Sequence, residues 1–480
     1  MASSNRYPDI LHFINGIWVN STERRSVINP FDESVIGEIP CADTTNLDSA
    51  VSAAKSGFLV WKATPPAKRY QIMMTAIKLI RERIEEFATV MTLDQGKPIA
   101  QSRLEVLRGC DIIEWDAGEG LRTYGRIIPS EPNMRHSVLR QPIGIVAAFS
   151  PWNFPMSSPA RKIGGSLAAG CSLILKPPEE TPAAAVLMAK AFADAGLPPG
   201  VLNLVFGDAA KISSYLIAEP AVRLITFTGS TAVGKKLAAQ AGQYMKPVVM
   251  ELGGHAPVIV CSDADPESAG SLSVLGKLRN AGQVCVAPTR FLVHNAIFEA
   301  FTNAFALKAN DLKVGDGLNP ENQMGPLANR RRMEAMESLA EDAVNKGARL
   351  ICGGKRIGKT GYLFPMTALA DVPSNARIMT EEPFGPIAII NRFHNLEEAI
   401  NTANSLPYGL AAYAFTKSAA VANRLALELE VGNLSINHFT ASLAETPFGG
   451  VKDSGYGREG GIEGLMHYMI TKNVSHLMQE

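Results

Sequence analysis

The chain has two regions that differ in the spacing of their apolar residues. From Leu47 to about Glu119, apolar residues recur at helical spacing, as in the segment AIKLIRERIEEFATVM. Beyond residue 140 the apolar residues form short unbroken runs instead, which is typical of strands that are buried on both faces of a sheet. We therefore predict a helical region near the N-terminus and, after it, a region built around buried strands.

The strand-like runs alternate with helix-like segments. The clearest runs are GIVAAFS (144–150), CSLILKP (171–177), VLNLVFG (201–207), RLITFTG (223–229) and APVIVCS (256–262). Helical segments between them are SSPARKIGGSLAAG, TPAAAVLMAKAFADAG and STAVGKKLAAQAG. This alternation predicts a parallel, doubly wound sheet with helices on both faces, as in Rossmann-like folds.

A second alternating region runs from about Ala256 to Phe448, with RFLVH, PIAIINRF and YAFT as strand candidates. The expected fold class is therefore α/β, with two doubly wound parallel-sheet units. In such a plan, the active site is expected in the crevice between the units.

Length and charge narrow the class of protein. The chain has 480 residues, too many for one ordinary core, which favours two or three domains. Lys plus Arg and Asp plus Glu number 46 each, so there is no positive excess to attract nucleic acid or anionic lipid, and we expect neither as a partner. The start, MASSNRYPDILHF, does not resemble a signal peptide, and no apolar stretch reaches the ~20 residues that span a bilayer. We expect a cytoplasmic protein.

The six cysteines are scattered and form no CxxC pairs. This pattern argues against a disulfide framework and against a zinc site, and it suits a reducing compartment. We expect no bound metal.

Three residues have side chains suited to covalent catalysis. Cys285 lies in RNAGQVCVAPTR, and this stretch alone favours a small packing residue over a nucleophile. Glu251, in VVMELGGHAP, ends an apolar run, and an apolar setting raises the pKa of a carboxyl group toward the range of a general base. Asn153, in SPWNFP, could donate to an oxyanion or only hold a turn.

Two strand ends have the features of a nucleotide site. RLITFTGSTAVGKK places Gly229 and Ser230 where a strand meets a helix, and free N–H groups at a helix N-terminus attract diphosphate. A plain N-cap turn is the alternative, and Lys236 stands where a P-loop needs Ser or Thr, so NTP hydrolysis is a weak interpretation. Lys176 and Glu179, in LILKPPEETP, suit ribose hydroxyls, but surface charges without a role would give the same local pattern.

Taken together, these pieces resemble the aldehyde dehydrogenase superfamily along nearly the whole chain. The motifs SPWNFP, KPPEETP, FTGS, MELGGHAP, GQVC, EEPFGP and PFGGVKDSG occur in the family's order and at its spacing. The resemblance implies that Cys285 is the nucleophile, forming a thiohemiacetal and then a thioester. It implies that the Asn153 amide and the Cys285 backbone N–H hold the oxyanion, and that Glu251 activates the hydrolytic water.

The resemblance also implies a nicotinamide cofactor. Its contacts would be Lys176 and Glu179 at the adenosine ribose, Gly229 and Ser230 at the diphosphate, and Glu382 and Phe384 at the nicotinamide ribose, with Trp152 as a further cofactor contact. Because Glu179 would repel a 2′-phosphate, NAD is expected over NADP. Some family members with such a glutamate use both, so NADP stays open.

Within the superfamily, the sequence is most similar to succinate-semialdehyde and 2-oxoglutarate-semialdehyde dehydrogenases. Arg161, Arg279 and Ser442 match positions with which the first group clamps a distal carboxylate, and Phe448 is expected to line the same pocket. Ser442 lies in a variable segment, and His255, in GGHAPVIV, matches the second group. The resemblance implies oxidation of succinate semialdehyde to succinate, with 2-oxoglutarate semialdehyde or a broad range of aldehydes as alternatives.

The resemblance also implies a domain plan. Residues 1–123 and 143–253 would form the cofactor domain, residues 254–450 the catalytic domain, and residues 124–142 and 466–480 a small β element. That element, which includes HYMITKNVSHLM, would join subunits into a homodimer or homotetramer.

Two other classes of function are alternatives. A thiol hydrolase would need a histidine partner for Cys285, and none of the eight histidines lies in a recognisable protease motif. A non-enzymatic binding protein would not require Cys285, Glu251 and Asn153 together.

Overall fold

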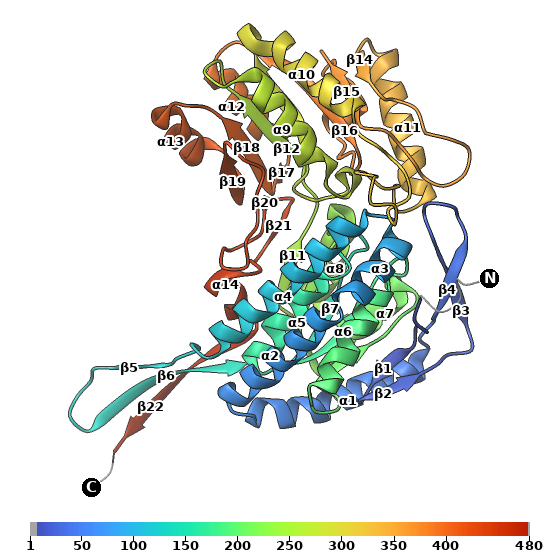
Figure 1. Ribbon diagram of the computed structural model, residues 1–480. Helices are drawn as coiled ribbons and strands as arrows, with labels where there is room; N and C mark the ends of the chain where they lie inside the picture. Colours follow the sequence, from blue (N-terminus) through green and yellow to red (C-terminus); the bar gives the residue numbers. More distant parts are fainter. Residues whose placement is uncertain (1–6, 479–480) are drawn as a thin grey trace.

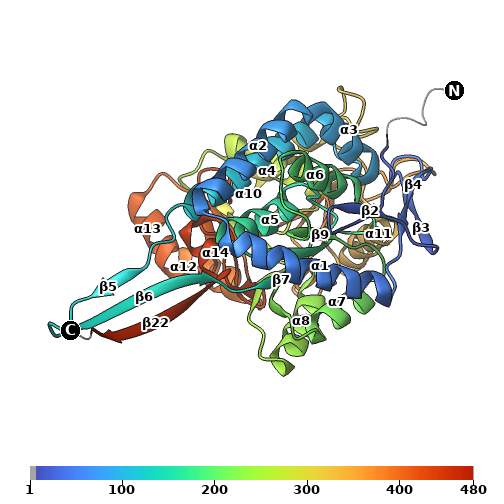
Figure 2. The same ribbon diagram turned by 90° about the horizontal axis from the view of Figure 1, so that it is seen from below.

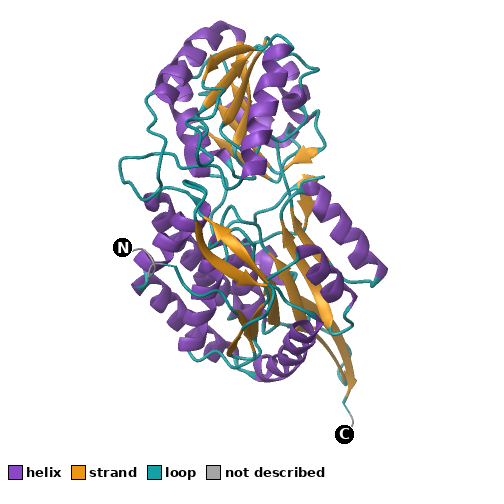
Figure 3. Cartoon of the chain, turned by 90° about the vertical axis from the view of Figure 1, so that its right-hand side faces the viewer, coloured by secondary structure: helices purple, strands orange, loops and turns teal. Residues whose placement is uncertain are grey.

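The computed structural model describes residues 7–478. Figure 1 shows two α/β units, each built around one large sheet, and a thin β arm that projects from the first unit. Figure 3 shows the two units one above the other, each with helices flanking its strands. The predicted fold class is confirmed.

The first sheet has eight strands in the order β2-β1-β9-β8-β7-β10-β11-β21. Its centre is parallel and consists of β7 (Ile145–Phe149), β8 (Ser172–Lys176), β9 (Leu202–Leu204), β10 (Val222–Thr228) and β11 (Val248–Glu251). Antiparallel strands close both edges: β1 (His12–Ile14) and β2 (Ile17–Val19) at one, β21 (Gly455–Tyr456) at the other. The unbroken apolar runs thus predicted the parallel centre, whereas the short edge strands lack such a signal.

Strand β7 explains why its sequence is apolar throughout. Ile145, Ala147 and Phe149 pack into the core on one face, and Val146 and Ala148 into the core on the other. The helices on the latter side are α2 (Pro66–Glu82), α3 (Ile84–Gln95), α4 (Ile99–Gly120), α5 (Ser157–Ala169) and α6 (Ala183–Asp194). Those on the former are α1 (Thr44–Ala63), α7 (Ala209–Ala218) and α8 (Thr231–Gln243). Both faces of the strand are therefore shielded from water.

The second sheet has seven strands in the order β14-β15-β16-β13-β12-β18-β19. The strands are β12 (Ala256–Val260), β13 (Pro288–His294), β14 (Arg349–Cys352), β15 (Thr367–Ala370), β16 (Ile387–Phe393), β18 (Ala411–Phe415) and β19 (Asn433–Ile436), and only β14 pairs antiparallel. One face carries α9 (Pro266–Leu278), α10 (Phe298–Asn310) and α11 (Arg330–Asn345), and the other carries α12 (Leu396–Asn404) and α13 (Ala419–Glu428). The domain boundary that we propose, between residues 253 and 254, falls in the short connection from β11 to β12.

The arm joins two distant parts of the chain, as Figure 2 shows. Strand β6 (Met134–Pro142) lies between β5 (Arg126–Ile128) and β22 (Met469–Leu477), and β22 pairs with it antiparallel from Met469 opposite Pro142 to Leu477 opposite Met134. Most arm residues are at least partly exposed. Its two outer strands present unpaired edges within this single chain.

The remaining elements are short. They are the hairpin of β3 (Arg24–Ile28) and β4 (Val35–Pro40), the pair β17 (Tyr408–Gly409) and β20 (Val451–Lys452), and the helix α14 (Gly461–Met466), with 3₁₀ turns η1 (Arg279–Gly282), η2 (Asn295–Ile297) and η3 (Arg377–Met379). No helix among residues 7–478 combines the length and apolar character needed to cross a bilayer.

Candidate active site

A cavity of about 710 Å³ lies where the two units meet. Its floor includes residues that directly follow or end three parallel strands of the first sheet: Asn153 after β7, Ser230 after β10 and Glu251 at the end of β11. The carboxyl ends of parallel strands are the usual place for ligands in such sheets. The predicted site residues that line it are Trp152, Asn153, Arg161, Gly229, Ser230, Glu251, Arg279, Cys285, Glu382, Phe384, Ser442 and Phe448.

Two predicted cofactor residues lie outside this lining. Lys176 ends β8, and Glu179 follows it in the next loop, where their side chains form an ion pair at 2.8 Å. Strand β8 pairs in parallel with β7, so Lys176 and Glu179 lie at the carboxyl ends of the strands, where the cavity also lies.

The loop before Cys285 adopts an unusual backbone. Asn280, Ala281 and Gly282 all have left-handed φ angles, of 50°, 52° and 72°. A Cβ at Gly282 would lie 2.2 Å from the Gly385 carbonyl oxygen, so this position needs glycine. Left-handed backbone at non-glycine residues costs about 1–3 kcal/mol each and persists only where surrounding contacts hold it. The contacts around residues 280–282 therefore hold the loop before Cys285 in this conformation.

Both the backbone carbonyl and the side-chain amide of Asn153 form hydrogen bonds. Its backbone carbonyl accepts hydrogen bonds from Lys97 Nζ at 2.9 Å and from Asn280 Nδ2 at 2.9 Å. Its side-chain amide donates to the Gln283 carbonyl at 3.0 Å. Only one of its two amide hydrogens is used in this way, so the other is free to donate to a ligand oxygen.

A buried ion pair supports this arrangement and was missed from the sequence. The Lys97 ammonium contacts the Glu105 carboxylate. Glu105 also accepts the backbone N–H groups of Met156 at 2.9 Å and Ser157 at 3.1 Å, at the start of α5. The two residues thus connect α4 to the loop that carries Asn153, and neither lies in a motif that signals this role.

Cys285 is half-buried and lines the cavity. Burial, and then the nearby carboxyl groups of Glu382 and Glu251, raise the pKa of its thiol to about 12, although Arg279 and the Val286 N–H act in the opposite direction. The thiol is therefore protonated at neutral pH until a base removes its proton.

Glu251 is buried, with 2% of its surface exposed, and neither carboxyl oxygen has a hydrogen-bond partner. Burial, and then the charge of Glu459, raise the pKa of Glu251 well above its ordinary value. A Cβ at Gly449 would lie 2.7 Å from Oε1 of Glu251, so glycine makes room for the carboxyl group. An unpartnered carboxyl with a raised pKa beside the thiol is what the sequence predicted for a general base.

A second buried pair lies beside Glu251 and was also missed. Lys162 Nζ donates to Glu459 Oε1 at 2.7 Å and to Thr228 Oγ1 at 2.8 Å. Glu459 lines the cavity, and the Lys162 ammonium lowers the pKa of Glu251. Lys162 lies one residue after Arg161 in SSPARK, but its partner is far along the chain, so local sequence carries no signal for the pair.

Two arginines also line the cavity. Arg161 donates to Ser442 Oγ at 2.6 Å, and its guanidinium lies 5.2 Å from the centre of the Phe448 ring. Arg279 lies 4.8 Å from the centre of the Phe154 ring. Within the part of the chain that the structure describes, no carboxylate lies within salt-bridge distance of either guanidinium, although Nη1 of Arg161 is buried and has no partner. Half-buried cations without a carboxylate partner suit an anionic ligand.

The remaining lining suits a dinucleotide. The side chain of Ser230, the N-cap of α8, makes no capping bond, so the first N–H groups of this helix are free to donate. The buried Thr231 Oγ1 next to it also has no partner. Glu382 accepts the Gly254 N–H at 3.2 Å, and Trp152 packs edge-on against Phe384 with ring centres 5.5 Å apart. Within residues 7–478, no group of three or more His, Cys, Asp or Glu side chains is placed to hold a metal.

Comparison with known proteins decides the family. The sequence pattern of the aldehyde dehydrogenase family matches residues 18–474 of this chain. The chain belongs to the aldehyde dehydrogenase family. It is therefore an oxidoreductase that acts on an aldehyde, and its family uses NAD or NADP.

Similar proteins differ in their named substrates. This aldehyde dehydrogenase is 45% identical over 470 residues to a 4-(hydroxymethyl)benzenesulfonate dehydrogenase of Comamonas testosteroni, which covers 97% of this chain and 98% of that one. It is 39% identical to the NADP(+) succinate-semialdehyde dehydrogenase of Escherichia coli, over 96% of each chain. A succinate-semialdehyde dehydrogenase structure from Burkholderia pseudomallei superimposes with a TM-score of 0.96 at 37% identity, over 100% of both chains.

Proposed function

We propose that this enzyme oxidises an aldehyde with a distal anionic group to the corresponding acid, with succinate semialdehyde as the first candidate and NAD as the preferred cofactor. The observation that supports this proposal is that one cavity is lined by a thiol, a buried carboxyl group and an arginine without a carboxylate partner, Arg161.

The thiol of Cys285 attacks the aldehyde carbon. Its proton must leave first, because its pKa is raised to about 12. Ionised Glu251 assists this loss, because both groups border the same cavity, and the proton passes on to bulk water, which leaves Glu251 ionised for the later step. The resulting thiohemiacetal oxyanion is held by the free amide hydrogen of Asn153 and by the Cys285 backbone N–H. Losing one such donor typically costs about 10²–10³ in rate.

NAD, when bound, supplies the acceptor for the hydride that leaves the former aldehyde carbon. Ser230 would hold its diphosphate, Glu382 its nicotinamide ribose, and Lys176 with Glu179 its adenosine ribose. After oxidation, the acyl group remains on Cys285 as a thioester. Glu251 then removes a proton from the water that attacks this thioester, and the acid is released.

Cofactor preference rests on Glu179. Its carboxylate is already paired with Lys176 at 2.8 Å, so a 2′-phosphate would displace the paired carboxylate and face its charge. The named E. coli relative nevertheless uses NADP. Glu179→Gln should narrow the ratio of kcat/KM values for NAD over NADP, since it removes the repulsion and keeps the shape. An unchanged ratio would show that Glu179 does not set the preference.

The substrate proposal rests on Arg161, Arg279 and Ser442. A guanidinium held by a serine hydroxyl donates paired, charge-assisted hydrogen bonds to a carboxylate. The decisive experiment compares kcat/KM for succinate semialdehyde, 2-oxoglutarate semialdehyde and butanal by NADH formation. We expect both charged aldehydes to exceed butanal by at least about tenfold. Equal values would leave an aldehyde dehydrogenase of broad range.

A second candidate is an aromatic aldehyde that carries a sulfonate group. The similarity to the Comamonas enzyme supports it. Adding 4-formylbenzenesulfonate to the same panel distinguishes the two candidates.

We also propose that the enzyme is a homodimer or homotetramer joined through the arm. Strands β5 and β22 offer unpaired edges, and so does β19 at the end of the second sheet. Edge pairing between subunits would satisfy these backbone groups. Light scattering should give a multiple of the 51.4 kDa chain mass. A monomer at micromolar concentration would contradict this assembly.

A further inference from the structure

A second pocket of about 400 Å³ opens beside the catalytic cavity. The two share Arg108, Phe154, Arg279, Val284, Val286 and Ala441 in their lining, so they are adjacent. Cys285, Arg161 and Ser442 line only the inner part. Arg279 therefore borders both pockets, whereas Arg161 and Ser442 do not line the outer one.

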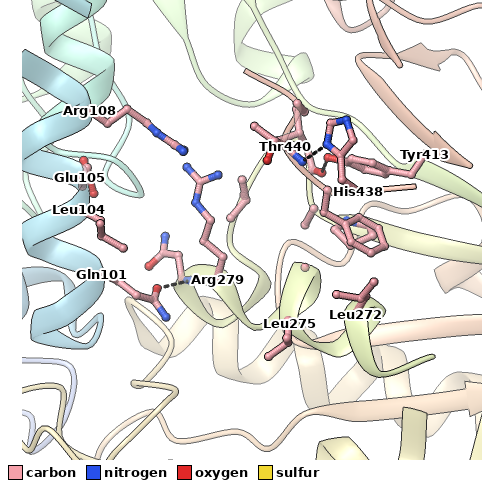
Figure 4. Close-up of a pocket in the computed structure, with 18 of the residues that line it drawn as sticks. Gln101, Leu104, Glu105, Arg108, Leu272, Leu275, Arg279, Tyr413, His438 and Thr440 are labelled. Atoms are coloured by element: carbon pink, nitrogen blue, oxygen red, sulfur yellow. Dashed lines mark hydrogen bonds between the residues drawn. The ribbon is translucent and has the colours of Figure 1, made fainter. Parts of the chain in front are cut away.

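Two guanidinium groups meet where the pockets join. Figure 4 shows Arg108, from helix α4, and Arg279 extending toward each other. Burial, and then the charge of Arg108, lower the pKa of Arg279 to about 10. Among residues 7–478, no carboxylate lies within salt-bridge distance of Arg108 or Arg279, and the Arg108 side chain forms no hydrogen bond with these residues.

Bringing two like charges together without an anion is unfavourable. Such an arrangement is stabilised when an anion binds between the two groups, since each guanidinium can then donate two parallel hydrogen bonds. Gln101 and Glu105, on the same face of α4, do not fill this role. Gln101 accepts the Asn280 N–H at 2.8 Å, and Glu105 is paired with Lys97.

The walls of the outer pocket are mainly apolar. Leu104, Leu272 and Leu275 line it and are 67%, 40% and 46% exposed, so they form an apolar mouth. Tyr413 and Phe439 lie deeper, with ring centres 4.9 Å apart. This lining suits a flat or elongated apolar body better than a short polar chain.

We infer that Arg108 and Arg279 form a second oxyanion subsite, used by aldehydes whose anionic group lies at the end of an elongated apolar body. The inference rests on the proposed aldehyde oxidation at Cys285. Benzaldehydes with a para carboxylate or sulfonate have the required shape, because their rigid ring separates the anion from the aldehyde. Arg161, Ser442 and Arg279 would serve short semialdehydes, and Arg108, together with Arg279, would extend the specificity to longer ones.

Arg108→Gln tests this division. With 4-formylbenzoate and 4-formylbenzenesulfonate, we expect kcat/KM to fall about ten- to a hundredfold, mainly through KM, because one charge-assisted contact is lost. Benzaldehyde, which has no anion, and succinate semialdehyde, which is too short, should change by less than about threefold. A larger loss with the sulfonate than with the carboxylate would identify the sulfonate as the better fit, and the reverse would identify the carboxylate.

The matched control is Arg103→Gln. Arg103 lies on the same helix, but its guanidinium pairs with Glu85 at 2.7 Å and 2.8 Å, and it lines neither pocket. This variant should keep wild-type values with all four aldehydes. Arg108→Gln values equal to wild type, or equal losses on all four aldehydes, would overturn the second subsite while leaving aldehyde oxidation in place. Failure of the wild type to oxidise any of the four would instead overturn the proposed function.

Discussion

Replacing Arg161 by Gln separates substrate binding from chemistry. Arg161 is held by Ser442 at 2.6 Å and has a buried Nη1 without a partner, so its guanidinium is oriented and available. Removing a charge-assisted pair costs roughly 1.5–3 kcal/mol, or about ten- to a hundredfold in kcat/KM for a substrate with a distal carboxylate. For butanal, the same change removes no such contact.

Arg161 also acts on the general base. Its charge is one of those that lower the pKa of Glu251, after the opposing effects of burial and Glu459. Arg161→Gln should therefore raise the pKa of Glu251 further and slow thioester hydrolysis with every aldehyde. The prediction is a modest loss common to both substrates and, with succinate semialdehyde alone, the additional ten- to hundredfold loss estimated for the clamp.

Initial rates of NADH formation with succinate semialdehyde and butanal, at matched pH, give both components. Ser442→Ala is the milder companion: it removes the hydroxyl that orients Arg161 but keeps the charge, and it should show a smaller effect in the same direction. Equal losses on the two aldehydes, in a variant whose circular dichroism and NAD binding are unchanged, would refute the clamp and leave Arg161 only its effect on Glu251.

The other predictions concern the chemical steps. Cys285→Ser should abolish turnover and keep NAD binding, measured by calorimetry, because a serine hydroxyl is a far weaker nucleophile at neutral pH; near-normal turnover would remove the covalent mechanism. Glu251→Gln should release about one NADH per active site in a burst and then turn over slowly; a missing burst would mean that Glu251 mainly activates the thiol. Glu459→Gln removes a negative charge that raises the pKa of Glu251, so the acidic limb of the pH profile of kcat should move to lower pH. An unmoved limb would show that it does not report on Glu251.

Sequence reasoning predicted what is encoded locally. The run GIVAAFS became β7, buried on both faces, and the ordered motifs placed Asn153, Glu251 and Cys285 at one cavity. The edge strands β1 and β2 were not predicted, because a strand of three residues is too short to show an alternating pattern. Helix α7 (209–218) was also missed, although its N-cap, Asp208, is a usual start signal.

The supporting pairs lay beyond sequence reasoning for a different reason. Lys162 and Glu459 are 297 positions apart, and Arg108 meets Arg279 only because α4 crosses from the first unit toward the second. No local pattern records which distant charges will meet after folding. Lys176 and Glu179 are an intermediate case: their position at a strand end was predicted, but their role as cofactor contacts stays a prediction.

The cavity takes its thiol from one unit and its amide and carboxyl groups from the other. Cys285 belongs to the second sheet's side, while Asn153 and Glu251 follow strands of the first, and the bond from Asn153 to the Gln283 carbonyl crosses between them. The site is therefore complete only when the two units are correctly positioned relative to each other. Under gentle denaturation, the reaction should fail while each half still holds its own core and its helical signal. A loss of activity would then report a shift of the two units relative to each other, before any loss of secondary structure is measured.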